Sequence, residues 1–336
     1  MFRYEVRHLL QQQTLAGPVT FVGLGAQSGR RSTVQVFPAA ADTGLRFVRC
    51  DLPANEGLLR ANWDNASASA IGTQLRNRFG HHLAPVDHLL SALTGLGIDN
   101  AEIFVDGPDL PLMDGSALPF VTALAGAGVV EAGAERDLLL VRKPVRIEHA
   151  DTWAELLPDM SQRITLAIES PCPTHGTQLL SLCLSPSVYV RELAAARTFG
   201  FADSRARLDL YGDMDASETD SRGVRPASDL ADIRFPDEYV RHKTLDVLGD
   251  LALAGRTVIG HLLTNRPGYT VVRDLLALAG QTPGALESVS ATGFYDCRSG
   301  GECLIQMGLA EPDPMAATAV PGDGFPAELR SAARRM

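Results

Sequence analysis

The stretch DEYVRHKTLDVLGDLAL, residues 237–253, has apolar side chains at helical spacing and predicts a helix over residues 238–253. Within it, His242 and Asp246 are four residues apart, so they lie on one face of the helix, one turn from each other. That spacing lets an imidazole and a carboxylate converge on one metal ion, as paired histidines do in zinc sites. A surface contact between the two side chains fits the same spacing, so the pattern alone leaves both interpretations open.

A second acid–histidine pair, Asp87 and His88, stands at the start of another predicted helix, residues 86–96, which ends at two nearby glycines. A carboxylate beside a metal ligand can take a proton from water and hand it on. The alternative is an ordinary helix N-terminus, where the helix dipole favours the negative charge of Asp87.

Composition narrows the class of protein. The chain has 336 residues, is 45% hydrophobic and carries a formal charge of −10, which disfavours nucleic acid and anionic membranes as partners but leaves room for a local pocket that binds a small phosphorylated molecule. Five scattered cysteines without a CxxC pair indicate a reducing compartment. No apolar run reaches transmembrane length and no signal peptide precedes the first predicted strand, so we expect a cytoplasmic enzyme or binding protein.

The rest of the chain predicts an α+β fold. The first half contains expected strands at 18–21, 32–37, 45–48 and 101–105 and a short helix at 119–125. The second half contains expected strands at 138–147, 153–157, 164–170 and 257–264 and a helix at 190–196. Residues 126–135, rich in Gly and Ala, are the expected linker.

We therefore expect two similar domains, residues 1–128 and 136–296, each a small β-sheet layered with α-helices. His88 belongs to the first domain, and His242 and Asp246 belong to the second, so the metal site is expected between the domains. Residues 297–336 are expected to form a partly disordered C-terminal extension.

Longer motifs carry a family resemblance. Residues 82–121, with PVDHLLSALTGLGIDN and GPDLPLMDGSALPFV, resemble the zinc-dependent UDP-3-O-acyl-N-acetylglucosamine deacetylases of lipid A biosynthesis. The likeness continues in ARTFGF at 196–201, in residues 237–253 and in Val-Ile-Gly at 258–260, and it spans roughly residues 15–278 in the same order. Several long motifs in register are more specific than any single short pattern.

The resemblance implies one zinc ion per chain on His88, His242 and Asp246, with Fe²⁺ as the alternative metal. Two imidazoles and one carboxylate leave a fourth position open, as catalytic zinc sites require. The implied substrate is an N-acetylated amino sugar or nucleotide sugar.

The resemblance also gives roles to neighbouring residues. Asp87 is implied as the general base, Lys243 as a positive charge near the oxyanion, and Thr198 as a hydrogen-bond donor to the acyl oxygen. Phe199 is implied to border the sugar site, and Asp250 to be the carboxylate that orients a catalytic imidazole.

Three positions with expected catalytic or binding roles depart from the family pattern, and Pro85 also replaces a Thr at the entry to the helix of His88. Asp87 replaces a Glu, so the carboxylate is one methylene shorter, and a misplacement of about 1 Å can cost roughly a hundredfold in rate. Tyr269, after Gly268, replaces a His; it can donate a hydrogen bond but cannot become cationic, which leaves Tyr269 as an alternative donor to Asp250. Gln27 replaces another His, and we assign Gln27 and Gly268 to substrate binding together with Phe199.

In the family, the segment that corresponds to residues 203–232 builds the passage for the fatty acyl chain, and here it is polar. A less lipidic substrate is therefore a rival to the lipid A precursor. The predicted function is zinc-dependent N-deacetylation; the alternative is a paralogue that binds metal without catalysis or with a different reaction.

Other polar residues have simpler expected roles. His81 and His82 are expected to be loop histidines, with substrate or metal contact as the alternative, and His261 a packed histidine. Arg197 and Arg241 flank the site motifs and either form local salt bridges or meet a nucleotide diphosphate.

Overall fold

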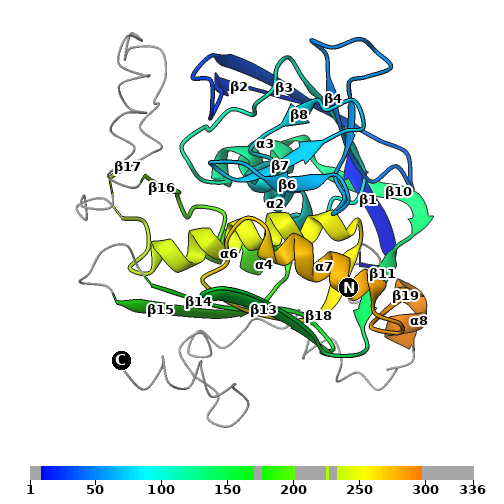
Figure 1. Cartoon of the computed structure of the whole chain (residues 1–336). Helices are drawn as coiled ribbons and strands as arrows, with labels where there is room; N and C mark the ends of the chain where they lie inside the picture. Colours follow the sequence, from blue (N-terminus) through cyan, green and yellow to red (C-terminus); the bar gives the residue numbers. More distant parts are fainter. Residues whose placement is uncertain (1–8, 170–175, 201–224, 227–232, 297–336) are drawn as a thin grey trace.

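The computed structural model describes residues 9–169, 176–200, 225–226 and 233–296. Figure 1 shows two sheet systems on either side of a central layer of helices. The first system has a five-stranded sheet in the order β2 (Val19–Leu24), β3 (Arg31–Pro38), β9 (Ala101–Val105), β4 (Leu45–Arg49) and β5 (Leu58–Arg60). Beside it lies a three-stranded sheet of β6 (Ala66–Ala68), β7 (Thr73–Arg76) and β8 (His82–Leu83).

The second system is a seven-stranded sheet in which β18 (Thr257–Asn265) is central. Strand β18 pairs in parallel with β11 (Asp137–Val141) and β14 (Gln162–Glu169), and antiparallel with β13 (Thr152–Leu157). The remaining strands are β12 (Val145–His149), β15 (Thr177–Cys183) and β19 (Leu286–Ser290). Six of the nine residues of β18 are buried, as expected for a strand with neighbours on both edges.

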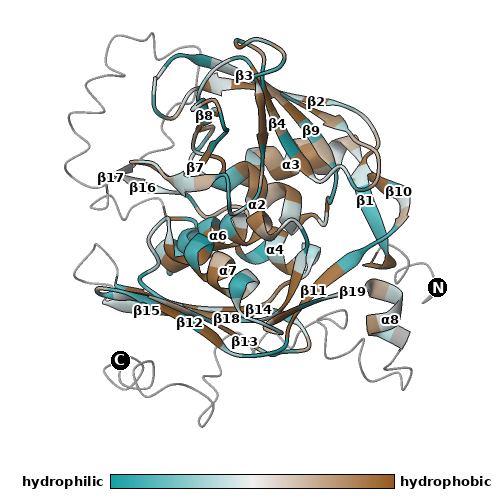
Figure 2. Cartoon of the chain, turned by 45° about the vertical axis from the view of Figure 1, so that its right-hand side comes forward, coloured by the Kyte–Doolittle hydropathy of each residue, from teal (hydrophilic) through white to brown (hydrophobic). Residues whose placement is uncertain are grey.

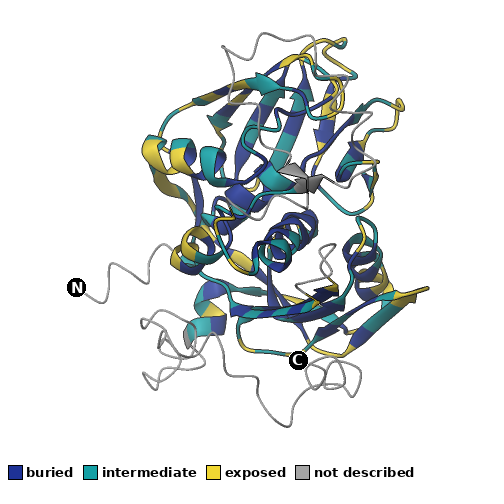
Figure 3. Ribbon diagram, turned by 90° about the vertical axis from the view of Figure 1, so that its left-hand side faces the viewer, coloured by how far each residue is buried: buried dark blue, intermediate teal, exposed yellow. Residues whose placement is uncertain are grey.

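Helices α2 (Asp87–Gly95) and α6 (Glu238–Leu251) pack against each other at the centre, and the 3₁₀ turn η4 (Ala252–Ala254) extends α6. The other helices are α3 (Leu118–Ala127), α4 (Pro186–Glu192), α7 (Val271–Gln281) and α8 (Ala291–Asp296). Figure 2 shows hydrophobic stretches on α2 and α3 beneath the first sheet, and Figure 3 shows buried residues on a central helix and along the strands on either side of it.

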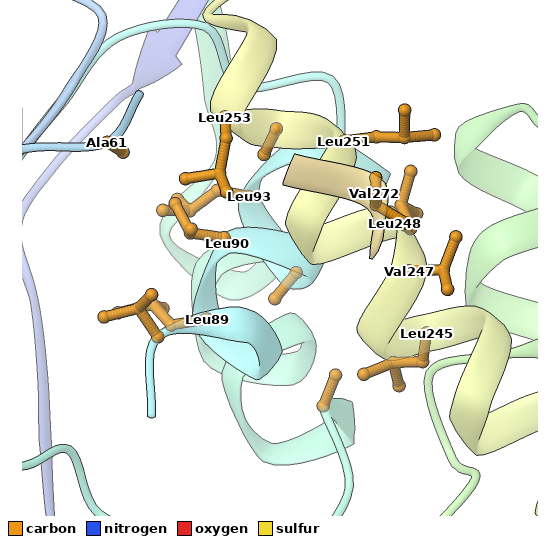
Figure 4. Packing of buried hydrophobic residues seen from close by; sticks show 14 of the residues in the cluster. Ala61, Leu89, Leu90, Leu93, Leu245, Val247, Leu248, Leu251, Leu253 and Val272 are labelled. Carbon is orange, nitrogen blue, oxygen red and sulfur yellow. The ribbon is translucent and has the colours of Figure 1, made fainter. Parts of the chain in front are cut away.

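One continuous hydrophobic core joins the two sheet systems through these helices. Figure 4 shows Leu90 and Leu93 of α2 together with Leu248 of α6 and Val272 of α7 in that core. Each fully buried side chain of this size contributes about 1.5–3 kcal/mol from removal of apolar surface from water. The core therefore fixes α2 against α6, and both helices carry expected metal ligands.

Several sequence predictions are confirmed. The α+β class is correct, and the helices expected at 86–96 and 238–253 are α2 and α6 with η4, within about a turn at their ends. The strand expected at 101–105 is β9. The likeness of the two halves and the division of the chain into domains remain predictions.

Three expectations about elements were wrong. The strand expected at 138–147 is two strands, because Lys143 and Pro144 separate β11 from β12 and Pro144 has no N–H for a ladder. The helix expected at 190–196 begins at Pro186, where the Ser185 side chain accepts a hydrogen bond from the Val188 amide. The expected linker instead contains strand β10 (Val129–Glu135), antiparallel to β1 (Gln11–Leu15).

Some predictions concern residues outside those described. The extension at 297–336 and almost all of the segment 203–232 belong there. Within the part of the chain that the structure describes, no helix is long and apolar enough to span a membrane.

A close approach between α4 and α2 depends on a glycine. The Tyr189 ring lies on Gly95, its side chain is fully buried, and its hydroxyl donates to Ser91 Oγ at 3.1 Å. A Cβ at position 95 would overlap the ring. Tyr189 is thus packed onto the same helix that carries His88.

We expect Gly95→Ala to destabilise the fold by about 1–3 kcal/mol, because overpacking of a close-packed contact forces side chains out of their rotamers. The matched control is Gly126→Ala in α3, where an added Cβ meets no atom within 4 Å. Removing Gly from that helix should stabilise by about 0.5–1 kcal/mol. Urea unfolding of both variants measures the difference, and equal midpoints would contradict the packing argument.

Candidate metal centre

The site forms where the first turn of α2 meets the middle of α6. Gly249 of α6 lies so close to α2 that a Cβ there would overlap the backbone of Asp87. This backbone-to-backbone approach brings His88, the second residue of α2, next to the ligands expected on α6.

His88, His242 and Asp246 meet as the sequence predicted. Their ligand atoms all lie within 4.8 Å of one another, and the two imidazole rings are edge to face with centroids 5.0 Å apart. The Nε2 atoms of His88 and His242 each lie 3.4 Å from Asp246 Oδ1. This is the only such group of three His, Cys, Asp or Glu side chains in the described ranges.

The surroundings of Asp246 Oδ1 test whether a metal ion fits this site. This oxygen is buried, and it has no hydrogen-bond partner among the described residues. A buried carboxylate oxygen without a partner is costly, and a cation between it and the two Nε2 atoms would remove that cost. Two imidazoles and one carboxylate are a donor set that zinc accepts, so these residues fit the expected ion.

His242 is held in the form that a metal requires. Its Nδ1 donates to the backbone carbonyl of Ala196 at 3.1 Å, which directs the Nε2 lone pair toward His88 and Asp246. Burial lowers the pKa of His242 to about 4, so its imidazole is neutral at physiological pH. At His88, burial works against the charge, but the carboxylates of Asp246 and Asp87 outweigh it and raise the pKa.

Lys243 supplies a positive charge beside the triad. Its Nζ donates to Asp246 Oδ2 at 3.0 Å and lies 4.3 Å from the centre of the Tyr269 ring. Burial opposes this charge, but Asp246, Tyr269 and Asp250 outweigh it and raise the pKa of Lys243. The ammonium is therefore charged at neutral pH, and the ring face of Tyr269 stabilises it further.

Asp87, the expected base, is buried and precisely held. Its Oδ2 accepts from the Thr73 amide at 3.1 Å, and its Oδ1 accepts from the His88 amide at 3.0 Å. Burial raises the pKa of Asp87 above its usual value, and the charge of Asp246 adds to this effect. A raised pKa brings a carboxylate closer to the range in which a general base works at neutral pH.

Asp250 differs from expectation. The carboxyl is buried, and burial raises its pKa well above the usual range. Its Oδ1 accepts a hydrogen bond from the Thr73 hydroxyl, and within the described residues Tyr269 is not a donor to it. The idea that Tyr269 donates to Asp250 was therefore wrong, because the Tyr269 ring instead lies against Lys243.

The other expected site residues are located as follows. The Thr198 amide donates to the Gly115 carbonyl at 2.8 Å, two residues from the carbonyl that holds His242. Phe199 belongs to β16 (Phe199–Gly200), but its side chain is outside the description. Gln27 and Gly268 are exposed, and the Gln27 amide donates to Asp109 Oδ2 at 2.9 Å. Their roles in substrate binding remain predictions.

Several polar residues have the structural contacts expected of them. His261 Nε2 lies 2.8 Å from Thr165 Oγ1, and Arg197 and Arg241 pair with acidic side chains of α6 and its N-cap. His81 is bound to Glu56 at 2.9 Å.

Sequence reasoning missed two residues of the site. The Ala196 carbonyl could have been located through the ARTFGF motif, which begins at that residue. Thr73 has no comparable signal, since a single Thr fourteen residues before Asp87 fits no ligand or base spacing.

Two imidazoles, a carboxylate and an adjacent buried acid on an α+β scaffold define a mononuclear metal hydrolase site. The profile of the LpxC family, described as UDP-3-O-acyl N-acetylglycosamine deacetylase, matches residues 12–278. The chain belongs to this family, whose members are zinc-dependent N-deacetylases of lipid A biosynthesis, and it is a metal-dependent hydrolase.

Curated relatives are similar in sequence to this chain over most of their own length. The UDP-3-O-acyl-N-acetylglucosamine deacetylase of Idiomarina loihiensis is 37% identical over 277 residues, which cover 80% of this chain and 89% of the relative. The enzymes of the same name from Shewanella loihica and Citrifermentans bemidjiense are 36% and 35% identical and again cover 80% of this chain. They are covered over 90% and 88% of their own lengths.

We expect the purified chain to bind one zinc ion, and Asp246→Ala to lose it, because the change removes the carboxylate that both imidazoles face. Metal content after dialysis, measured by atomic emission, checks this. Asp99→Asn is the control, since Asp99 is a largely buried carboxylate that pairs with Arg136 away from the triad. Full zinc retention by Asp246→Ala would refute the assignment.

Proposed function

We propose that the chain hydrolyses the N-acetyl group of UDP-3-O-acyl-N-acetylglucosamine, with zinc on His88, His242 and Asp246. The observation that supports this most directly is the buried Asp246 Oδ1, which has no hydrogen-bond partner among the described residues and lies 3.4 Å from the Nε2 atoms of His88 and His242. The buried Asp87 carboxyl belongs to the residue next to His88 in the chain. Membership of the LpxC family supplies the reaction class, and the names of the relatives supply the substrate. The cytoplasmic location expected from the sequence remains part of this proposal.

A zinc ion in such a site acts as a Lewis acid and lowers the pKa of a water molecule. Asp87 then takes the proton of the attacking water while the water oxygen bonds to the amide carbon. When the C–N bond breaks, Asp87 returns that proton to the leaving nitrogen, so acetate and a free amine are the products. Its raised pKa suits a group that both accepts and donates a proton near neutrality.

In this proposal, a positive charge and two hydroxyl groups stabilise the oxyanion that forms on the amide oxygen. Lys243 brings a fixed charge into a buried environment, where electrostatic interactions are stronger than in water. Thr198 and Tyr269 contribute hydroxyl donors. Burial raises the pKa of Tyr269 to about 12, so its hydroxyl stays protonated and can donate.

The substrate we propose keeps the 3-O-acyl chain of the family. The polar segment 203–232 was the ground for expecting a less lipidic substrate, but it lies almost wholly outside the described residues. The comparisons give no support to an altered substrate, because the relatives carry the name of the acylated nucleotide sugar.

We expect the zinc-loaded chain to release acetate from UDP-3-O-acyl-N-acetylglucosamine, and Asp87→Asn to lower kcat by roughly 10²–10⁴-fold, the contribution of a general acid–base group. Coupled detection of acetate measures the rate, with Asp99→Asn as the control variant. If the zinc-loaded protein turned over neither this substrate nor a panel of N-acetylated sugars, the non-catalytic alternative would hold instead.

Two substitutions at position 269 distinguish the contribution of the hydroxyl to catalysis from that of the ring. Tyr269→Phe keeps the ring over Lys243 but removes the donor, and we expect kcat to fall by about 10²-fold, as for loss of one oxyanion donor. Tyr269→His restores the residue of the family pattern, and its pH–rate profile should gain a group that titrates near ~6.5. Full activity of Tyr269→Phe would exclude a role for the hydroxyl.

A further inference from the structure

Thr73, the first residue of β7, connects the two acidic groups of the site. It is 1% exposed. Its amide donates to Asp87 Oδ2 at 3.1 Å, its carbonyl accepts from the Val86 amide at 3.0 Å, and its hydroxyl donates to Asp250 Oδ1. Every polar group of this residue is therefore used to join β7 to the start of α2 and to α6.

The two carboxyls come from different helices, and Thr73 is their shared donor. Asp250 lies one turn beyond Asp246 on α6, so its position is tied to that of a metal ligand. Asp87 precedes His88 on α2, so its position is tied to that of His88, another expected metal ligand. A donor that holds both carboxyls fixes the relation between the two helices where the reaction takes place.

The residue before Thr73 leaves space for this arrangement. Gly72 has φ +154°, and a Cβ there would overlap Asp87 Oδ2 and the Pro85 side chain. The Asp87 carboxylate thus occupies the volume that a side chain at position 72 would fill. The placement of Asp87 therefore depends on the start of β7, because Gly72, just before the strand, makes room for the carboxylate and the Thr73 amide donates to it.

We propose that Thr73 is a positioning residue for deacetylation, which sets Asp87 through its amide and Asp250 through its hydroxyl; this inference rests on the proposed function. A contact that served stability alone would not need two carboxyls, because apolar residues of similar volume commonly stabilise a buried site as well or better. The position of both buried carboxyls beside the expected metal ligands points instead to a part in the reaction, for which Thr73 holds them in place.

The test removes the hydroxyl and keeps the shape. Thr73→Val should leave zinc content and KM unchanged and lower kcat by about tenfold to a hundredfold, because a catalytic group displaced by about 1 Å can cost 10²-fold. Thr73→Ser, which keeps the hydroxyl, should restore most of kcat. The matched control is Thr264→Val: Thr264 is fully buried in β18 and its hydroxyl donates to the Trp153 carbonyl at 2.8 Å.

A double-mutant cycle shows through which residue Thr73 acts. In an Asp250→Ala background, Thr73→Val should cause no further loss of kcat, because the acceptor of the hydroxyl is gone. Thermal unfolding of the metal-free proteins gives a second readout, in which the two changes should also be non-additive. Additive effects in both measurements would show that the hydroxyl does not act through Asp250.

The outcomes separate this inference from the proposed function. If the native zinc-loaded chain releases no acetate, the proposed function fails, and the inference fails with it. If the native chain is active and Thr73→Val matches it in kcat, or loses no more than Thr264→Val, only the inference is overturned. Loss of zinc from Thr73→Val at normal folding would likewise overturn it, since the effect would then be on the metal.

Discussion

The contact between α2 and α6 is the constraint on which the rest of the structure depends. Gly249 allows the backbone of α2 to lie directly on α6, and the leucines of both helices bury the surface around that point. A side chain at position 249 would separate the helices and would move His88 away from its two partners. The two sheet systems hold this pair of helices from either side, so the precision of the site comes from core packing.

The electrostatics of the site follow from its burial. Three carboxyls, Asp87, Asp246 and Asp250, lie together at low exposure, an arrangement that is unfavourable without compensating positive charge. Lys243 supplies one such charge, and a divalent ion would supply the rest. The three carboxyls differ in their pKa values. Burial raises the pKa of Asp87 and Asp250. At Asp246 the neighbouring His242, Lys243 and His88 side chains outweigh the effect of burial and lower the pKa. In the function we propose, this difference suits Asp246 to bind the metal and Asp87 to carry the proton.

The sequence predicted best where a pattern is local. The period of apolar residues located α2 and α6, and the i, i+4 spacing on α6 together with the family motifs predicted the three residues that meet in the candidate metal group. It failed where a contact joins distant segments. Thr73 reaches Asp250 across 177 positions of sequence, and no periodicity encodes such a pair. Strand β10 was mistaken for a linker because its Gly and Ala residues lack strand propensity, and its pairing with β1 decides its conformation.

The location of the three ligands on two helices has a consequence for the lifetime of the protein. His88 would reach an ion from the helix beneath the first sheet system, and His242 and Asp246 would reach it from the helix that lies on the second. An ion bound there would act as a cross-link within the core, and at a free concentration a thousand times its Kd it would add about 4 kcal/mol to the free energy of unfolding. Cells short of zinc would then hold this chain partly unfolded and exposed to proteases, so its abundance would follow the metal supply.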